Sequence, residues 1–436
     1  MNHLQIAFLI LLLAKTAADF WLERKNRAYA LAKADEFEAN GFATAPKLGD
    51  GLYANYRKTV NYTVEKTDFG MVETAWDALW SAALVLFLYA PLCAFAGTLF
   101  GADAVAVGSW AQVWREGVVL AAISVALSLT SIPFDLYSTF RIEEKYGFNK
   151  STAKLWITDQ VKSVALGFVI GVPLVWALSA FYHALPRTWW IFAACAVFAF
   201  QLALIVVFPK WILPLFNKLS PLPEGELRER LEALATRAGF VAEKIEVIDG
   251  SKRSGHSNAF FTGFGKWRRI VIYDTLIAQL SPAEIEAVLA HEIGHSRRGH
   301  VAKGLVFAAV ACFVVFGLVG WTLGRPEFFE AFGFEFRDGF MFVPALLLLG
   351  KIFPLFGFWL SPLTNRLSRR HEYEADAFAK EITGTPEPLI SALEKLHTEN
   401  LANLTAHPLY SAFHYSHPTL FERAAALRGD AKPTGR

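Results

Sequence analysis

Seven long apolar runs limit what this chain can fold into more than any other feature. The first extends from His3 to Trp21, and each of the others has about 20 residues, enough to span a bilayer as a helix. One run could be a buried helix of a soluble protein, but no soluble core needs seven. The sequence therefore predicts a mainly α-helical, polytopic membrane protein with seven transmembrane helices. The six later runs lie near residues 78–100, 117–137, 162–183, 188–209, 302–324 and 340–361.

The first run has a second interpretation, a cleaved secretory signal peptide, because small residues follow at Ala17 and Ala18. A signal peptide begins with a basic segment, which is missing here, and the run continues into Phe20 and Trp21. We therefore predict that the first run is retained as a membrane span.

The distribution of Lys and Arg predicts the orientation of the chain in the membrane. The segments between spans one and two and between spans three and four are rich in basic residues, whereas the intervening loops hold few. Basic loops stay on the cytoplasmic side. We therefore expect the N-terminus outside, and segment 210–300 and the C-terminal tail in the cytoplasm. The compact length and the absence of an obvious retention tail favour a bacterial inner membrane over the endoplasmic reticulum.

Composition argues against two other kinds of site. The formal net charge is +2, which gives no sign of nucleic-acid binding. The three cysteines, Cys93, Cys195 and Cys312, lie inside apolar runs without ligand spacing. Neither a disulfide framework nor a cysteine zinc site is therefore expected.

The pattern H-E-x-x-H at residues 291–295 indicates a metal site. His291 and His295 are four residues apart, which on a helix places both imidazoles on one face, where they can bind one ion. Glu292 lies beside that position, so it can take a proton from a water molecule that the metal activates. This is the arrangement of zinc proteases, although such short strings also occur by chance in long helices.

The residues before the motif predict the helix that carries it. Ser281 and Glu284 have the spacing of a capping box, with Pro282 at the first helical position. Apolar residues then recur at helical spacing as far as Ile293. The alternative is a helix that merely carries two histidines.

A hydrolytic zinc site usually has three protein ligands, so a third must be found. The metzincin extension of the motif is absent, and His300 is interpreted as a polar residue at a helix end. Glu372 and Asp376 follow span seven and are four residues apart. That spacing suits one carboxylate on the metal and a second that orients a ligand histidine.

The alternative for this segment is a charged helix face exposed to solvent. Arg369, Arg370 and Glu374 fit that alternative, and His371 is expected on a neighbouring face, away from the metal.

The predicted elements divide the chain into four parts. Segment 210–300 is predicted as a mixed α/β zinc protease domain, with a helix at 224–239, strands at 244–248 and 269–273, and then the motif helix. The four parts are 1–209 with spans one to five and their loops, 210–300 with the protease domain, 301–361 with spans six and seven, and 362–436 as a C-terminal helical part that completes the zinc site.

Longer strings make a family resemblance specific. They include F-R-I-E-E-K-Y-G-F-N-K at 140–150, D-G-S-K-R-S-G-H-S-N-A-F at 249–260 and S-R-R-H-E-Y-E-A-D at 368–376, with further matches at 214–222 and 415–423. With these strings the chain resembles the type I CaaX prenyl endopeptidases, the membrane zinc proteases that mature yeast a-factor and prelamin A. The resemblance implies seven long helices around a large chamber, capped on the cytoplasmic side by a gluzincin-like α/β protease domain.

The same resemblance implies roles for the candidate residues of the motif segments. It implies His291, His295 and Glu372 as ligands of one zinc ion per chain. Glu292 is then the general base, and Asp376 supports the ligands from behind.

Three more residues enter through the resemblance alone. Asn258 is expected on an edge strand beside the site, where an extended peptide can pair and contact it. His417 and Arg423 match a tail motif placed near the zinc, and there His417 can donate to the developing oxyanion. Without the resemblance, His417 would be interpreted as a surface turn residue before Pro418. Thr419 stands where a second proline is common.

The predicted function is hydrolysis of a protein or peptide near its C-terminus, with release of the aaX tripeptide from a CaaX end that can be prenylated. The expected partners are this substrate and the lipid bilayer, with no nucleic acid, and the chain is expected to be a monomer. One alternative is a membrane quality-control zinc protease of the heat-shock type, which the seven spans and the 140–150 string disfavour. Another is a transporter or scaffold with a vestigial site, which the intact ligands and base disfavour.

Overall fold

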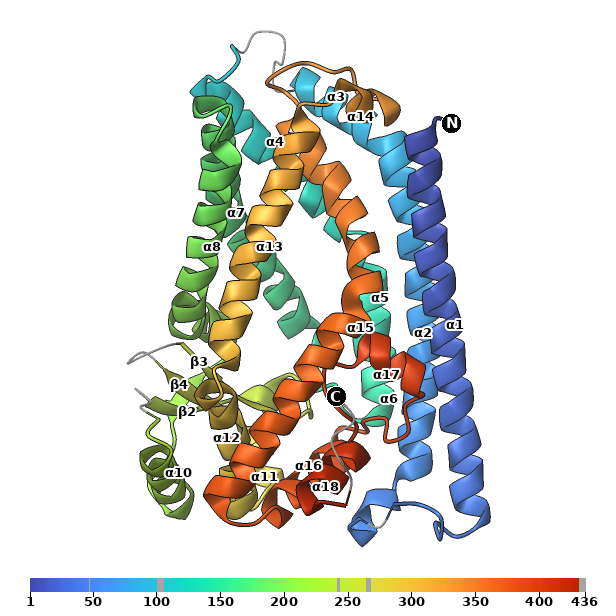
Figure 1. Cartoon of the computed structure of the whole chain (residues 1–436), viewed down its shortest axis with the longest axis vertical. Helices are drawn as coiled ribbons and strands as arrows, with labels where there is room; N and C mark the ends of the chain where they lie inside the picture. The colour runs from blue at the N-terminus through green and yellow to red at the C-terminus, as the bar shows by residue number, and fades with distance from the viewer. Residues whose placement is uncertain (47, 100–105, 241–243, 264–267, 431–436) are drawn as a thin grey trace.

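The computed structural model describes residues 1–436 except 47, 100–105, 241–243, 264–267 and 431–436. Long helices run along the longest axis of the molecule, and a small sheet with short helices lies at their lower end in Figure 1. Within the described residues, seven helical segments are long and apolar enough to cross a membrane, as predicted. They are His3–Ala39, Tyr56–Thr98, Trp110–Ser128, Ala153–Ala184, Trp189–Phe216, His300–Leu323 and Phe342–Thr383.

Five of these segments are single helices, and two contain a wider π-helical turn. The second segment changes to π geometry at Leu84–Leu88, and the fifth does so at Phe208–Ile212, where Pro209 removes a backbone donor. The helices are α1 (His3–Ala39), α2 (Tyr56–Ala83), α3 (Tyr89–Leu99), α4 (Trp110–Ser128), α7 (Ala153–Ala184), α8 (Trp189–Val207), α9 (Leu213–Phe216), α13 (His300–Leu323) and α15 (Phe342–Thr383).

The predicted third span, 117–137, is wrong at its C-terminal end. Helix α4 ends at Ser128, the chain turns at 129–131, and a separate short helix α5 (Ile132–Tyr137) follows. Pro133 explains the break, because it lacks the amide that would continue the helix and instead occupies the first turn of α5. The other membrane prolines inside long helices, such as Pro173 and Pro354, do not interrupt them.

In the part of the chain that the structure describes, the sheet has four strands in the order β1-β2-β4-β3. Strands β2 (Lys244–Ile248) and β4 (Arg269–Tyr273) were predicted, and they pair in parallel. Strand β1 (Leu219–Pro221) pairs antiparallel with β2 and was not predicted from the sequence. Strand β3 (Ala259–Thr262) pairs antiparallel with β4 and forms one edge of the sheet.

Shorter helices complete the fold. The predicted helix at 224–239 is α10, and the motif helix is α12, which lies at the lower end of the molecule with α16 and α18 (Figure 1). The shorter helices are α6 (Glu144–Tyr146), α10 (Glu226–Arg237), α11 (Asp274–Gln279), α12 (Pro282–Arg297), α14 (Pro326–Ala331), α16 (Glu387–Glu399), α17 (Pro408–His414) and α18 (Leu420–Arg428).

Two large clusters of buried apolar residues lie at opposite ends of the molecule. The membrane cluster joins the start of α1 with α4, α8, α13 and the first turns of α15. The other cluster joins α10, α12, α16 and α18 with the polar ends of α1 and α2, for example Phe37 and Tyr56. The helices of spans one and two therefore continue beyond their apolar parts and pack on the protease domain.

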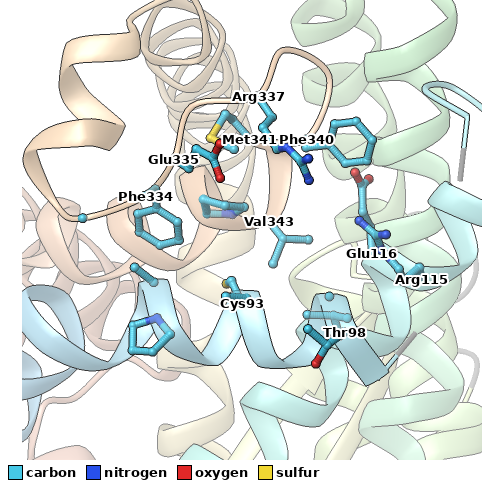
Figure 2. A pocket seen from close by; sticks show the side chains of 17 residues that line it. Cys93, Thr98, Arg115, Glu116, Phe334, Glu335, Arg337, Phe340, Met341 and Val343 are labelled. Atoms are coloured by element: carbon cyan, nitrogen blue, oxygen red, sulfur yellow. The ribbon is translucent and has the colours of Figure 1, made fainter. Parts of the chain in front are cut away.

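A cavity of about 550 Å³ lies between α3, α4 and the segment that leads into α15. Figure 2 shows Arg115 and Glu116 of α4 on one side of it and Glu335 and Arg337 of the α14–α15 connection on another. These elements lie at the upper end of Figure 1, far from α12. The cavity is therefore separate from the candidate metal centre.

Candidate metal centre

The H-E-x-x-H motif lies on α12, and the predicted capping box begins that helix. Ser281 Oγ accepts a hydrogen bond from the Glu284 amide at 3.4 Å, and Glu284 Oε2 accepts one from the Ser281 amide at 2.7 Å. Glu284 also accepts a hydrogen bond from Lys395 Nζ of α16 at 2.8 Å. The start of the motif helix is thus anchored to the C-terminal part of the chain.

Gly294 allows α12 to lie directly against α15. A Cβ atom at position 294 would lie 3.0 Å from the Cα and the carbonyl oxygen of Ala375, which is tighter than nine in ten Cβ contacts in proteins. The glycine inside the motif therefore permits the contact that brings Glu372, about one turn before Ala375, to the two histidines.

His291, His295 and Glu372 form a group that could hold a metal ion within the described residues. The Nε2 atoms of the two histidines are 3.2 Å apart. His291 Nε2 lies 3.4 Å from Glu372 Oε2, and His295 Nε2 lies 3.2 Å from Glu372 Oε1. Tetrahedral zinc with ligands at 2.0–2.1 Å separates two ligand atoms by about 3.3 Å, so the three residues fit a zinc ion.

The carboxylate of Glu372 gives a second indication that the group is built for a cation. Glu372 is 4% exposed, and its Oε2 atom accepts no hydrogen bond from the residues that the structure describes. A buried carboxylate oxygen without a hydrogen bond is costly unless a cation compensates it.

Glu292 is next to the first ligand and partly buried. Burial raises the pKa of the Glu292 carboxyl group, because the charged form loses solvation. A carboxylate with a raised pKa is a stronger base, which is the property expected of a group that accepts a proton from water.

His291 is held from behind by two residues of the C-terminal part. Its Nδ1 atom lies 2.8 Å from Asp376 Oδ1, and Arg423 donates to both carboxylate oxygens of Asp376, at 2.6 and 2.9 Å. All three side chains are buried. A carboxylate that accepts a hydrogen bond from a ligand histidine fixes the ring orientation.

His300 and Glu374 lie behind the other histidine. His300 is the first residue of α13, as predicted, but its side chain is only 5% exposed and its Nδ1 atom lies 3.1 Å from His295 Nδ1. His300 Nε2 lies 3.0 Å from Glu374 Oε2. The Glu374 side chain is 32% exposed and contacts the buried His300, so the prediction of a solvated charged face holds for Glu374 only in part. His371 stacks on His300 and is not part of the metal-binding group.

The segment that carries His417 is attached to α15. Arg369 donates to the carbonyl oxygens of Ser411 at 3.1 Å and Tyr415 at 2.8 Å, so Arg369 too departs from the predicted solvated face. His417 Nε2 lies 3.5 Å from Glu372 Oε1, while its side chain is 65% exposed. His417 is therefore an exposed side chain next to the metal-binding group.

Asn258 directly precedes the edge strand β3, which packs against α12. Its side chain is exposed, and its Oδ1 atom accepts a hydrogen bond from the Ala259 amide at 2.8 Å. Its carbonyl oxygen accepts one from the Tyr273 amide of β4 at 3.1 Å. The backbone around Asn258 is therefore fixed to the sheet, and its side chain is open to solvent.

Two family models match adjacent parts of the chain. Residues 53–218 match the CAAX prenyl protease N-terminal model with five membrane helices, and residues 221–431 match the model of peptidase family M48. Together they cover the membrane helices from α2 onwards and every element of the candidate metal centre. A metalloprotease family of this kind implies a bound metal and a peptide or protein substrate.

Similar proteins agree with these matches over most of the chain. CAAX prenyl protease 1 of Saccharomyces cerevisiae is 41% identical over 71% of this chain and 71% of its own length. A CAAX prenyl protease 1 homolog of Oryza sativa is 38% identical over 88% of this chain and 90% of its own. The crystal structure of S. mikatae Ste24p matches with a TM-score of 0.84 and 32% identity, over 98% of this chain and 99% of that one. The chain therefore belongs to the type I CaaX prenyl endopeptidase family and is a multi-pass membrane zinc metalloendopeptidase.

Proposed function

We propose that His291, His295 and Glu372 bind one zinc ion per chain. The observation that carries this proposal is the set of three separations of 3.2 to 3.4 Å between the facing nitrogen and oxygen atoms. When bound, zinc supplies a Lewis acid that polarises a carbonyl group and lowers the pKa of water. Metal analysis of the purified protein tests the stoichiometry.

Glu292 is proposed as the general base. Its carboxylate accepts the proton of the attacking water molecule and later passes a proton to the leaving amine. Asp376 and Arg423 keep His291 in place during the reaction, and they do not exchange protons with the substrate. This assignment rests on the position of Glu292 next to His291 and on its partial burial.

His417 and Asn258 are proposed as substrate contacts. His417 donates a hydrogen bond to the scissile carbonyl oxygen as that oxygen gains negative charge. The exposed Asn258 side chain lies at the start of the edge strand β3, and an extended peptide adds to such an edge through backbone hydrogen bonds. The His417 assignment rests on its exposed side chain 3.5 Å from Glu372, and the Asn258 assignment on its exposed side chain directly before β3, which packs against α12.

The proposed substrate is a protein whose C-terminal CaaX sequence is prenylated, and the proposed product is the free aaX tripeptide. The names of the relatives support this substrate class. The geometry supports a substrate at the membrane: α12 and the membrane helix α13 are separated by two residues, and Glu372 belongs to the helix of the last span. A lipid-anchored chain end can therefore stay in the bilayer while its peptide part reaches the site.

The test uses purified enzyme and two matched CaaX peptides, one farnesylated and one without the lipid. We expect release of the last three residues of the farnesylated peptide, detected by mass spectrometry, and loss of cleavage after zinc is chelated. Cleavage of a misfolded membrane protein with neither peptide cut would favour the heat-shock-type quality-control protease instead.

The proposed location is a bacterial inner membrane, or the endoplasmic reticulum membrane if the source is eukaryotic, with the metal centre toward the cytoplasm and the enzyme as a monomer. The distribution of basic residues supports the orientation. A reporter fused after Arg436 should behave as cytoplasmic, and one inserted near Phe329 as external. Cell fractionation tests the membrane, and light scattering in detergent tests the monomer. An external C-terminus would reverse the proposed orientation.

A further inference from the structure

The two histidines of the metal group have unlike supports. His291 is backed by the carboxylate of Asp376, whereas His295 is backed by the imidazole of His300. We propose that His300 and Glu374 are positioning residues. Two hydrogen bonds, from His295 to His300 and from His300 to Glu374, hold the His295 ring in the orientation in which it can bind the metal. This inference rests on the zinc site proposed above and adds two residues to it.

The direction of the hydrogen bonds follows from which nitrogen faces the metal. His295 Nε2 points to the metal group, at 3.2 Å from both His291 Nε2 and Glu372 Oε1. A neutral imidazole that binds a metal through Nε2 keeps its proton on Nδ1. That proton faces His300 Nδ1 at 3.1 Å, so His300 Nδ1 must be the acceptor.

The direction of the remaining hydrogen bonds then follows. Because His300 Nδ1 accepts, a neutral His300 carries its proton on Nε2. His300 Nε2 lies 3.0 Å from Glu374 Oε2, so it donates to this carboxylate. Arg370 Nε donates to the other oxygen of Glu374 at 3.0 Å. Each link therefore has one donor and one acceptor, and metal binding at His295 selects one tautomer for both histidines.

The residues behind His291 and those behind His295 are arranged in a similar way. On one side, His291 is followed by Asp376 and Arg423. On the other, His295 is followed by His300, Glu374 and Arg370. In both cases a carboxylate of α15 stands behind a histidine of α12, and an arginine neutralises it. The additional histidine bridges the gap to Glu374, which lies on α15 two residues after the ligand Glu372.

The position of His300 is fixed by its surroundings. Gly299, with a φ of +72°, forms the turn between α12 and α13, and His300 is the first residue after it. The His300 ring is parallel to the His371 ring, with centroids 4.0 Å apart and an angle of 14° between the planes. Burial and stacking hold the ring, as a ligand support requires.

The experiment measures zinc affinity of the full-length protein by competition with a chelator. His300→Leu removes the acceptor, and we expect roughly a 10–100-fold weaker zinc affinity, the usual effect of losing such a support. His300→Asn places an amide oxygen near the former Nδ1 atom and should recover part of that loss. Glu374→Gln should weaken zinc binding by less than His300→Leu. The visible spectrum of the cobalt-substituted protein should change in His300→Leu, because the orientation of His295 changes.

Two control variants test whether the effect is specific. His371→Phe keeps the stacked ring but loses its nitrogens, and Glu381→Gln changes an exposed carboxylate on α15 that pairs with Arg298 at 3.2 Å. Both should bind zinc as the unmodified protein does. The metal-free His300→Leu protein loses two hydrogen bonds and should unfold at a lower temperature than the metal-free parent. Zinc should raise the unfolding temperature of the parent by more than that of the variant, which a purely structural role would not predict.

Three outcomes would overturn the inference. They are an unchanged zinc affinity in His300→Leu, no recovery of zinc affinity in His300→Asn, and a rise in unfolding temperature on zinc binding that is equal in His300→Leu and the parent. Glu372→Ala separates this failure from failure of the metal site itself. If Glu372→Ala loses zinc while His300→Leu does not, only the positioning role is wrong. If Glu372→Ala keeps zinc, the proposed ligand set is wrong.

Discussion

The metal centre has a local half, formed by His291, Glu292 and His295, and a distant half, formed by His417 and Arg423. The two halves differ in what holds their residues in place. On α12, His291, Glu292 and His295 lie within five consecutive positions, so helical geometry alone sets their spacing. His417 and Arg423 come more than 120 residues later, and their positions depend on contacts between separate elements. Helix α12 alone therefore fixes the spacing of His291 and His295, whereas the positions of His417 and Arg423 depend on how the C-terminal segment is attached to α15.

One face of α15 makes that attachment. Its polar residues recur three or four positions apart, and each contacts the segment between Ser411 and Leu427. The contacts join Asn365 to the Phe413 carbonyl at 2.8 Å, Arg369 to the Tyr415 carbonyl at 2.8 Å, Glu372 to His417 at 3.5 Å, Asp376 to Arg423 at 2.6 Å and Lys380 to the Leu427 carbonyl at 2.7 Å. The same face of α15 thus carries the proposed metal ligand Glu372 and holds the distant half beside it.

The strongest test of the local half is Glu292→Gln. The amide cannot accept the proton of the water molecule, so kcat should fall by about 10²–10⁴-fold. Zinc content should stay near that of the unmodified protein, because the proposed ligands are unchanged. Glu286→Gln, on the same helix but paired with Arg230 at 3.1 Å, is the matched control and should keep full activity. Normal turnover by zinc-loaded Glu292→Gln protein would remove Glu292 as the base.

The strongest test of the distant half is Arg423→Met. Arg423 is buried, and its loss leaves the charge of Asp376 without its partner, which should cost about 3–5 kcal/mol of stability. Zinc affinity should fall as well, because Asp376 then no longer holds His291. Chemical denaturation in detergent and a chelator competition measure the two effects. Arg428→Met, which removes an exposed pair with Glu387, should change neither by a comparable amount.

A smaller effect is expected from Arg369→Met, which separates the two halves most clearly. It removes two hydrogen bonds from a charged donor to the carbonyl oxygens of Ser411 and Tyr415, a loss of about 1–3 kcal/mol. The segment that carries His417 should become looser, so kcat should fall while zinc affinity stays unchanged. Arg366→Met, at an exposed position of the same helix, is the control. A fall in zinc affinity equal to the fall in kcat would show that the halves are not separable.

The sequence predicts the local half well and the distant half only through resemblance. Spacing identified His291, Glu292 and His295 and the capping box, because all of these depend on helix geometry over a few residues. The spacing also placed Glu372 and Asp376 on one helix face, but it could not predict which residues of α12 they would contact. That contact depends on Gly294, which allows α12 and α15 to approach each other closely.

The incorrect predictions for two charged residues of α15 have a common cause. Arg369 and Glu374 have the composition of a solvated face, and only the packing of α13 and the C-terminal segment buries their contacts. The break after Ser128 was missed because proline is tolerated inside several other membrane helices of this chain. The large chamber implied by the resemblance stays a prediction.

Helix α15 continues without interruption from the membrane to the metal centre, and its length sets the depth at which the reaction takes place. Glu372 comes 30 residues after Phe342, a distance of about 45 Å along a helix. A bilayer with its head groups measures about 40–45 Å, so a helix of this length set along the membrane normal reaches from one surface to the other. In a thinner bilayer the helix would tilt and the site would stay at the head-group boundary. We therefore expect substrates to be selected by where they can rest: a chain end anchored by a lipid is already at this depth, whereas a dissolved peptide must first adsorb to the membrane.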